Sequence, residues 1–322
     1  MGALGAARIT PAALVRPAAE VDGVRVGAVA ARDVARAQRF AERHGIARVC
    51  RDYAELIADP EIDAIYIALP NGLHAEWSIR ALEAGKHVLC EKPMAANADE
   101  ARRMADVAAA TGRVLVEAFH WRYHRLSERV LEILRSGELG RLERFEGNMC
   151  FPLPLPRDIR YRYDLAGGAM MDAGCYAVSF VRQLSGQEPE VVGARAKRAA
   201  RDVDRAMQVD LRFPDGARGR LRASMWSWRL LDISLRVVGE GGELRVLNPV
   251  MPQLFHRLRV RSAAGRRVEQ VRGEGTYAAQ LRAFRAAVQD GRPVPTDAED
   301  AVANMRVIDA AYRAAGMRAR GT

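Results

Sequence analysis

The chain has 322 residues, more than a usual single domain, so its length favours two domains, or one large domain, around a well-buried core. Almost half of the residues are hydrophobic, but no run approaches the ~18 consecutive apolar residues that cross a bilayer, which argues against a membrane protein. The net charge is +10, yet the arginines stand at helical spacing beside acidic residues, which is typical of solvated helix faces and argues against nucleic-acid binding.

Cysteine spacing and the N-terminal residues bear on the compartment. The cysteines are far apart in the sequence and lack the paired spacing of a zinc site or a disulfide framework, so we expect no bound metal. The segment Met1 to Ala7 lacks the charged start and long apolar stretch of a secretory signal. We therefore expect a cytoplasmic protein.

The first ~120 residues alternate short β-rich runs with amphipathic helices, as βαβ units of a parallel sheet do. Strands are predicted at 24–30, 64–69, 87–90 and 114–118. Helix starts are predicted after the capping residues Asp33, Asp52 and Asn97, and helix ends at Gly45, Gly85 and Gly112. The pattern predicts an α/β, doubly wound Rossmann domain over residues 1–120. Because only Met1 to Leu4 precede the first turn, its first strand is either very short or truncated.

After residue 120 the pattern changes to alternating segments joined by turns. A helix near 126–134 is followed by runs at 207–213 and 217–226 around the hairpin signal Pro214-Asp215-Gly216, and the run 231–238 continues the meander to a turn at 239–242. This predicts an α+β domain over residues 121–322 with a large, mostly antiparallel, open-faced sheet. An open sheet face exposes strand edges and apolar residues, so we expect a homodimer or homotetramer formed through it.

Two amphipathic helices close the chain. The first places Tyr277, Leu281, Phe284 and Val288 on one face, and the second is capped by Asp297.

A dinucleotide site needs a tight turn between the first strand and the first helix, so that backbone N–H groups reach the pyrophosphate. The segment Gly5-Ala6-Ala7-Arg8-Ile9-Thr10 occupies this place as a degenerate form of the glycine-rich motif, with Thr10 at the third glycine position. An ordinary small-residue turn is the alternative. The predicted cofactor contacts here are Gly5, Ala6, Ala7, Arg8 and Ile9.

The end of the second strand indicates which cofactor is bound. NAD sites usually carry an acidic residue there, but this chain has Ala31 followed by Arg32. A guanidinium group suits the 2′-phosphate of NADP, whereas a carboxylate would repel it. The sequence therefore favours NADP over NAD, which stays possible, and an uninvolved surface arginine is the alternative.

Further motifs follow the predicted strands and recur in the second domain. They are Pro70-Asn71-Gly72-Leu73-His74, Glu91-Lys92-Pro93, the segment from Glu117 to His124, and Gly167-Gly168-Ala169-Met170-Met171-Asp172-Ala173-Gly174-Cys175-Tyr176. Together they resemble the glucose-fructose oxidoreductase/inositol dehydrogenase (Gfo/Idh/MocA) family, in particular the branch of dihydrodiol dehydrogenase and NADP-dependent xylose dehydrogenase. The resemblance covers nearly the whole chain.

This resemblance implies an NAD(P)-dependent dehydrogenase that acts on sugars, cyclic polyols or dihydrodiols. It places Lys92 beside the nicotinamide and the reacting hydroxyl, where an ammonium group stabilises a developing alkoxide. We predict Tyr176 as the general base and Asp172, one helical turn away, as a positioning residue. A buried tyrosine satisfied by a buried aspartate is the alternative.

The resemblance also implies further contacts. Those with the cofactor would come from Leu69, Pro70, Asn71, His74, Glu91 and Lys92, and those with a small-molecule substrate from His120, Arg122, Arg162 and Tyr176. His74 at a helix surface, and His120 and Arg122 in core packing, are the structural alternatives. Two other functions stay open: a dinucleotide- or sugar-sensing regulator without turnover, and a glycosidase with tightly bound NAD.

Overall fold

The computed structural model describes residues 1–200, 202–227 and 231–321, which divide into two compact units. Unit 1 comprises residues 1–120 together with 277–302. Unit 2 comprises the described residues of 121–276 and 303–321. The segment 277–302, which the sequence analysis assigned to the second domain, thus belongs with the first unit.

Unit 1 is built on a parallel sheet. Among the described residues it has six strands in the order β3-β2-β1-β4-β5-β6. The strands are β1 (Gly2–Leu4), β2 (Ala28–Ala30), β3 (Arg48–Val49), β4 (Ala64–Ile67), β5 (His87–Cys90) and β6 (Leu115–Glu117). This order confirms the predicted doubly wound Rossmann sheet. The strands are shorter than the apolar runs from which they were predicted. Strand β1 is only three residues long, yet it pairs with both β2 and β4.

The helices described in unit 1 are α1 (Arg16–Glu20), α2 (Val34–His44), α3 (Tyr53–Ala58), α4 (His74–Glu83), α5 (Ala98–Thr111) and α8 (Thr276–Asp290). Three of them, α2, α3 and α5, begin directly after a predicted capping residue. The Asp33, Asp52 and Asn97 side chains each accept a hydrogen bond from a backbone N–H in the first turn of α2, α3 and α5. Gly45 and Gly112 end α2 and α5 in the left-handed conformation, as predicted.

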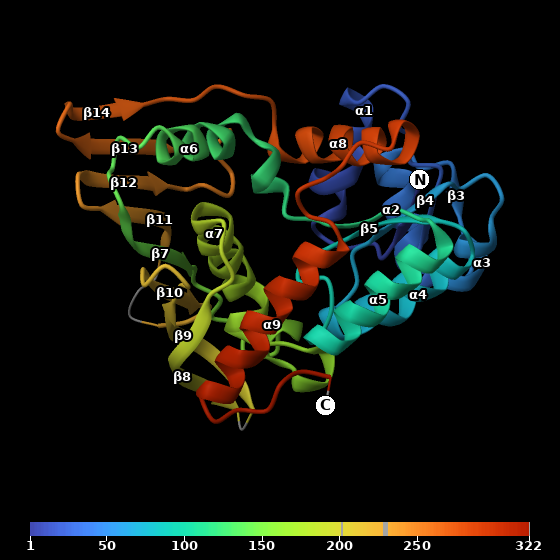
Figure 1. Cartoon of the computed structure of the whole chain (residues 1–322). Helices are drawn as coiled ribbons and strands as arrows, with labels where there is room; N and C mark the ends of the chain where they lie inside the picture. Colours follow the sequence, from blue (N-terminus) through green and yellow to red (C-terminus); the bar gives the residue numbers. More distant parts are fainter. Residues whose placement is uncertain (201, 228–230, 322) are drawn as a thin grey trace. The chain divides into compact units, whose positions relative to one another are not determined.

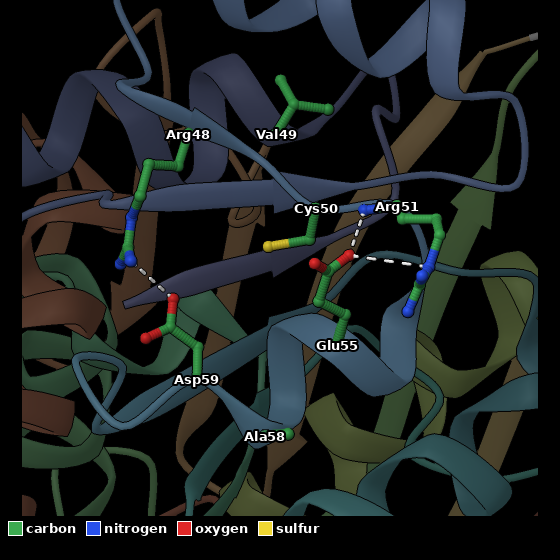
Figure 2. Close-up of a pocket in the computed structure, with 7 residues that line it drawn as sticks. All are labelled: Arg48, Val49, Cys50, Arg51, Glu55, Ala58 and Asp59. Carbon is green, nitrogen blue, oxygen red and sulfur yellow. Dashed lines mark hydrogen bonds and ion pairs between the residues drawn. The ribbon is translucent and has the colours of Figure 1, made fainter.

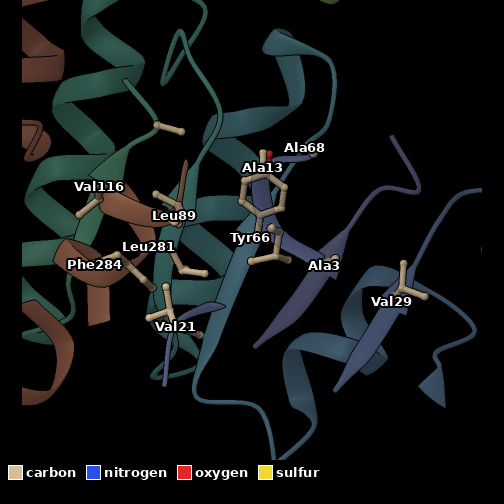
Figure 3. Packing of buried hydrophobic residues seen from close by; sticks show 14 of the residues in the cluster. Ala3, Ala13, Val21, Val29, Tyr66, Ala68, Leu89, Val116, Leu281 and Phe284 are labelled. Carbon is tan, nitrogen blue, oxygen red and sulfur yellow. The ribbon is translucent and has the colours of Figure 1, made fainter. Parts of the chain in front are cut away.

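A hydrophobic cluster joins one face of the sheet to the helices above it (Figure 3). Strand residues such as Ala3 and Leu89 contribute to the cluster, and so do Leu14 and Val21 from the region of α1. Leu281 and Phe284 of α8 complete it, which confirms the apolar face predicted for this helix. Helices α4 and α5 pack side by side on the opposite face (Figure 1).

Unit 2 contains a larger sheet, with eight strands among the described residues in the order β14-β13-β12-β11-β7-β10-β9-β8. The strands are β7 (Leu142–Cys150), β8 (Glu190–Ala200), β9 (Val203–Arg212), β10 (Arg218–Ser224), β11 (Asp232–Gly239), β12 (Gly242–Leu247), β13 (Arg257–Ser262) and β14 (Gly265–Glu269). Apart from the parallel pair β7–β10, neighbouring strands are antiparallel, as predicted.

The hairpin β9–β10 and the turn between β11 and β12 lie where the sequence predicts them. The predicted continuation of the meander from β10 to β11 is wrong, because β7 lies between these strands and pairs with both. Helix α7 (Cys175–Ser185) packs on this sheet, and Gly147 of β7 makes the approach possible: a Cβ there would lie 2.8 Å from the Ala177 carbonyl oxygen. Helices α6 (Arg125–Arg135) and the end of α9 (Ala298–Ala314) complete unit 2.

The sheet face opposite α7 is rich in arginine. Strand register and exposure place ten exposed arginines of the described chain on this outer face: Arg144, Arg195, Arg212, Arg218, Arg220, Arg245, Arg257, Arg259, Arg261 and Arg266. The sequence analysis placed the arginines on solvated helix faces, so for this group the prediction is wrong. The intervals between these arginines suggested helices, but residues that alternate along several strands are separated by similarly short intervals. None of the helices in the described part of the chain has the length and apolar character to span a membrane.

Candidate active site

The turn after β1 has the backbone geometry of a dinucleotide-binding loop. Gly5 adopts φ +102°, and a Cβ on it would lie 2.7 Å from the Ala68 carbonyl oxygen, so only glycine fits. The loop leads into a π-helical turn (Pro11–Val15) continued by α1. Thr10, at the third glycine position of the motif, is fully buried, and its hydroxyl donates to the Gly5 carbonyl at 3.3 Å. The threonine therefore closes the turn rather than disrupting it.

The loop is also held from α2. The Arg36 guanidinium donates a 2.7 Å hydrogen bond to the Ala6 carbonyl oxygen. Asp33, the nearest carboxylate to the end of β2, accepts from the Arg36 backbone N–H at 3.1 Å and so serves as the helix cap. Arg32 is exposed just beyond β2. The arrangement places two guanidinium groups near this strand end, and sequence reasoning identified only Arg32.

The segments after β4 and β5 are joined by His74. Its two ring nitrogens each lie 2.8 Å from a backbone carbonyl oxygen, one of Pro93 and one of Leu69. The side chain is buried, which lowers its pKa. His74 thus links the segment that carries Pro70-Asn71 to the segment that carries Lys92. The sequence analysis expected it to contact the cofactor, with a helix-surface position as the alternative, and the structure shows the side chain buried between these two segments.

Lys92 lies on a loop braced by buried polar groups. Glu91 accepts a 2.7 Å hydrogen bond from the hydroxyl of Tyr66, a fully buried residue of β4. On the other side of Lys92, the Met94 backbone N–H donates at 2.8 Å to the carboxylate of Glu117, also fully buried. The Lys92–Pro93 peptide bond is cis. These contacts fix the backbone on both sides of the lysine at the carboxyl end of β5.

His120 lies in unit 1 with its ring stacked on Tyr277, the centroids 4.0 Å apart. Burial and the charge of Lys92 lower the pKa of His120 to about 3, so the imidazole is neutral at physiological pH. The pKa of Tyr277, the second residue of α8, is shifted in the other direction: burial and the negative charge of Glu91 raise it. Sequence reasoning placed Tyr277 only on an apolar helix face, because nothing local links it to Glu91 nearly 200 positions earlier.

In unit 2, Asp172 and Tyr176 lie on one continuous helical run. A π-helical turn (Met170–Gly174) leads directly into α7, and Tyr176 is nearly fully buried in its first turn. The Asp172 carboxylate pairs with the Arg160 guanidinium at 3.1 Å, and the Asp172 backbone N–H donates to the Gly168 carbonyl. The predicted helical placement of the pair is therefore correct. Arg160 is a partner of Asp172 that the sequence analysis did not identify.

The remaining predicted substrate residues have different surroundings. Arg162 is exposed and forms an ion pair with Asp164 two positions on. Arg122 is partly buried in a short 3₁₀ turn (His120–Tyr123). Neither position by itself indicates a role.

A pocket of unit 1 lies elsewhere, at the edge of its sheet (Figure 2). It measures about 520 Å³ and is lined by residues in and next to β3 and α3, among them Arg48, Cys50 and Asp59. Arg48 and Asp59 form an ion pair at 2.8 Å across it. Of the described residues that we predict in the site, none lines this pocket, so we do not place the chemistry there.

Comparison with known proteins matches both halves of the chain to one family. Residues 1–119 match the oxidoreductase family with an NAD-binding Rossmann fold, and residues 127–245 match the Gfo/Idh/MocA C-terminal domain.

Individual relatives match over most of their length. D-xylose 1-dehydrogenase (NADP(+)) 2 from Haloferax volcanii is 37% identical over 318 residues, covering 98% of this chain and 96% of the relative. Trans-1,2-dihydrobenzene-1,2-diol dehydrogenase from Sus scrofa is 35% identical, covering 70% of this chain and 67% of the relative. The crystal structure of a 3-ketoreductase from Actinomadura kijaniata, in complex with NADP and TDP-benzene, is 30% identical with a TM-score of 0.91, covering 98% of this chain and 97% of that one.

Proposed function

The chain belongs to the Gfo/Idh/MocA oxidoreductase family, and on this premise we propose that it is an NADP-dependent dehydrogenase of a sugar, cyclic polyol or dihydrodiol. NAD is the alternative cofactor. The relatives that support this substrate class are named for D-xylose and for a dihydrodiol.

One observation carries the proposal: the bracing of the Lys92 loop. Three buried side chains form hydrogen bonds with the segment around Lys92: Tyr66 with Glu91, His74 with Pro93 and Glu117 with Met94. Burying polar groups is costly unless they are hydrogen-bonded, and a merely solvent-exposed lysine needs no such support. The bracing favours a lysine held in place for chemistry, and it argues against the regulator without turnover.

The loop after β1 fits a dinucleotide. A Cβ on Gly5 would lie against the Ala68 carbonyl oxygen, so the turn requires glycine, as the tight turn of a dinucleotide-binding motif does. The residues from Gly5 to Ile9 would hold the pyrophosphate, and Arg32 would hold a 2′-phosphate. Leu69, Pro70, Asn71 and Glu91 follow β4 and β5 and would border the rest of the cofactor. When bound, the nicotinamide supplies or takes up the hydride.

The chain's own residues would handle the proton and the developing charge. As the substrate C–H bond breaks, the Tyr176 phenolate oxygen accepts the hydroxyl proton and becomes a phenol. The Lys92 ammonium stabilises the negative charge that develops on the substrate oxygen. The ion pair of Asp172 with Arg160 orients the turn that precedes Tyr176. His120, Arg122 and Arg162 would contact other hydroxyl groups of the substrate.

The proposal is tested by offering D-xylose, trans-1,2-dihydrobenzene-1,2-diol and an inositol with NADP⁺ or NAD⁺ and following absorbance of the reduced nicotinamide. Tyr176→Phe should slow turnover by roughly 100- to 10,000-fold, the range for a general acid or base. Lys92→Met should also lower turnover. The double variant should lose less than the product of the single effects, because residues that act as a unit are not additive.

Matched controls are Tyr53→Phe, since the Tyr53 ring meets Trp77 edge to face, and Lys86→Met, since the Lys86 ammonium donates to the Asp59 carbonyl. Near-normal turnover of Tyr176→Phe would show that the phenol is structural. Hydrolysis of a glycoside without net reduction of the cofactor would favour the glycosidase alternative.

We also propose that the chain forms a homodimer or homotetramer through the outer face of the unit 2 sheet. Exposed apolar residues such as Leu247 and Val268 lie on this face, but arginines outnumber the carboxylates there. Two such faces repel each other at low ionic strength, and salt screens that repulsion. Sedimentation should therefore show tighter association as salt is raised, and a monomer at all salt concentrations would refute the interface. Fractionation of the source cells tests the predicted cytoplasmic location.

A further inference from the structure

Unit 2 contains a buried ion pair that the proposed mechanism does not use. Arg320 and Asp204 are both fully buried, and the Arg320 Nη2 lies 3.1 Å from the Asp204 Oδ1. The guanidinium also stacks on the ring of Tyr312, 4.0 Å from the centroid. Burial raises the pKa of Asp204, and the charge of Arg320 opposes that shift.

Both partners hold the turn that precedes the Asp172–Tyr176 segment. The Arg320 Nε donates to the Gly167 carbonyl at 2.7 Å, and the Asp204 Oδ2 accepts from the Met170 backbone N–H at 2.7 Å. The Tyr312 hydroxyl donates to the Asp204 Oδ1 at 2.8 Å. The carboxylate is therefore fixed by donors on several sides, and it fixes the first residue of the π-helical turn in return.

Gly168 lies between those two contacts, and the side chains of Asp204 and Arg320 approach its Cα closely. It adopts φ +139°, and a Cβ on it would lie 2.2 Å from the Asp204 Oδ1 and 2.8 Å from the Arg320 Nη2. Its carbonyl accepts from the Asp172 backbone N–H at 3.0 Å. If the ion pair moved, the backbone hydrogen bonds would therefore shift Asp172 and, one helical turn later, Tyr176.

A buried ion pair is weak evidence for stability, because well-packed apolar residues are often as stabilising. What this pair provides is a fixed position for a backbone turn. We infer that Arg320 is a positioning residue for catalysis, which through Asp204 and Gly167 sets the place of Asp172 and Tyr176. The inference rests on the proposed role of Tyr176.

The test compares Arg320→Gln and Arg320→Lys with Arg318→Ala, with D-xylose and NADP⁺ as substrates. Arg318 is an exposed neighbour whose guanidinium lies 5.5 Å from the Tyr163 ring, so it controls for general effects at this chain end. Arg320→Gln should lower kcat by about 100-fold, the effect of a small misplacement of a reacting group. KM for NADP⁺ should stay unchanged, because the cofactor loop belongs to unit 1. Arg320→Lys should recover part of kcat, since an ammonium still pairs with Asp204.

Hydrogen exchange gives a readout that needs no turnover. In Arg320→Gln the amides of 167–176 should exchange faster, while those of α8 stay as in the parent chain. If Arg320→Gln fails to fold, the same two measurements on Asp204→Asn/Arg320→Gln, which removes both charges and so leaves neither unpaired, decide the question. Equal kcat and equal exchange in Arg320→Gln and Arg318→Ala would overturn the inference, and so would faster exchange throughout unit 2.

The double variant Tyr176→Phe/Arg320→Gln separates this inference from the proposed function. If Arg320 acts through Tyr176, the double variant should be no slower than Tyr176→Phe alone. Multiplied losses would overturn the positioning role while leaving the base assignment intact. Normal turnover in Tyr176→Phe would instead overturn the proposed function, whatever Arg320 does.

Discussion

Gly168→Ala is the substitution whose effect follows most directly from the structure. The residue has φ +139°, in a region that side-chain-bearing residues rarely adopt. The added methyl would also lie 2.2 Å from the Asp204 carboxylate, 2.6 Å from the Tyr312 hydroxyl and 2.8 Å from the Arg320 guanidinium. All three side chains are fully buried, so none can move into solvent without breaking the others' contacts.

Two terms give the magnitude. The backbone conformation costs about 1 to 3 kcal/mol for a residue other than glycine. Separating a buried ion pair costs about 3 to 5 kcal/mol when it leaves a charge uncompensated. The free energy of unfolding of unit 2 should therefore fall by about 4 to 8 kcal/mol, a large part of the ~5 to 15 kcal/mol that stabilises a typical domain.

Gly186→Ala is the matched control, because Gly186 ends the same helical run. It has φ +66° and no atom within 4 Å of an added Cβ, so only the conformational cost of about 1 to 2 kcal/mol applies. Urea unfolding followed by circular dichroism compares the two. Equal destabilisation by both substitutions would refute the reasoning. It would mean that the side chains of Asp204, Tyr312 and Arg320 accommodate the added methyl group at no cost in free energy.

The other predictions concern unit 1. Arg32→Ala should weaken NADP⁺ binding by about 10- to 100-fold and leave NAD⁺ binding unchanged, as measured by calorimetry; equal losses would remove Arg32 from the 2′-phosphate site. Because the folded chain keeps His120 neutral down to pH about 3, against an ordinary pKa of 6.5, stability present above pH 6.5 should be lost as the pH falls toward 3. His120→Phe, which keeps the stacking on Tyr277, should flatten this dependence of unfolding free energy on pH, and an unchanged slope would contradict the lowered pKa. Phe284→Ala should cost unit 1 about 3 to 5 kcal/mol by opening a cavity in the cluster around the sheet, whereas an effect confined to unit 2 would contradict the division of the chain.

The local features of the fold could be predicted from the sequence because they depend on neighbouring residues. Asp33, Asp52 and Asn97 cap helices through a backbone N–H three positions on, so the sequence alone locates those helix starts. The hairpin β9–β10 likewise follows from its turn residues. The motifs that together indicated the family, Glu91-Lys92-Pro93 among them, could be recognised for the same reason: the residues of each motif are contiguous.

Only the tertiary structure decided which distant segments meet. The sequence could not place β7 between β10 and β11, because strand pairing is set by packing over more than 50 intervening positions, and Gly147 matters only once α7 lies against it. The same holds for α8, whose apolar face was predictable although its partners Leu14 and Val21 were not. Arg320 and Asp204 are 116 positions apart, and neither has a local signal. A periodic pattern shows that a face will be buried, but long-range packing alone chooses what covers it.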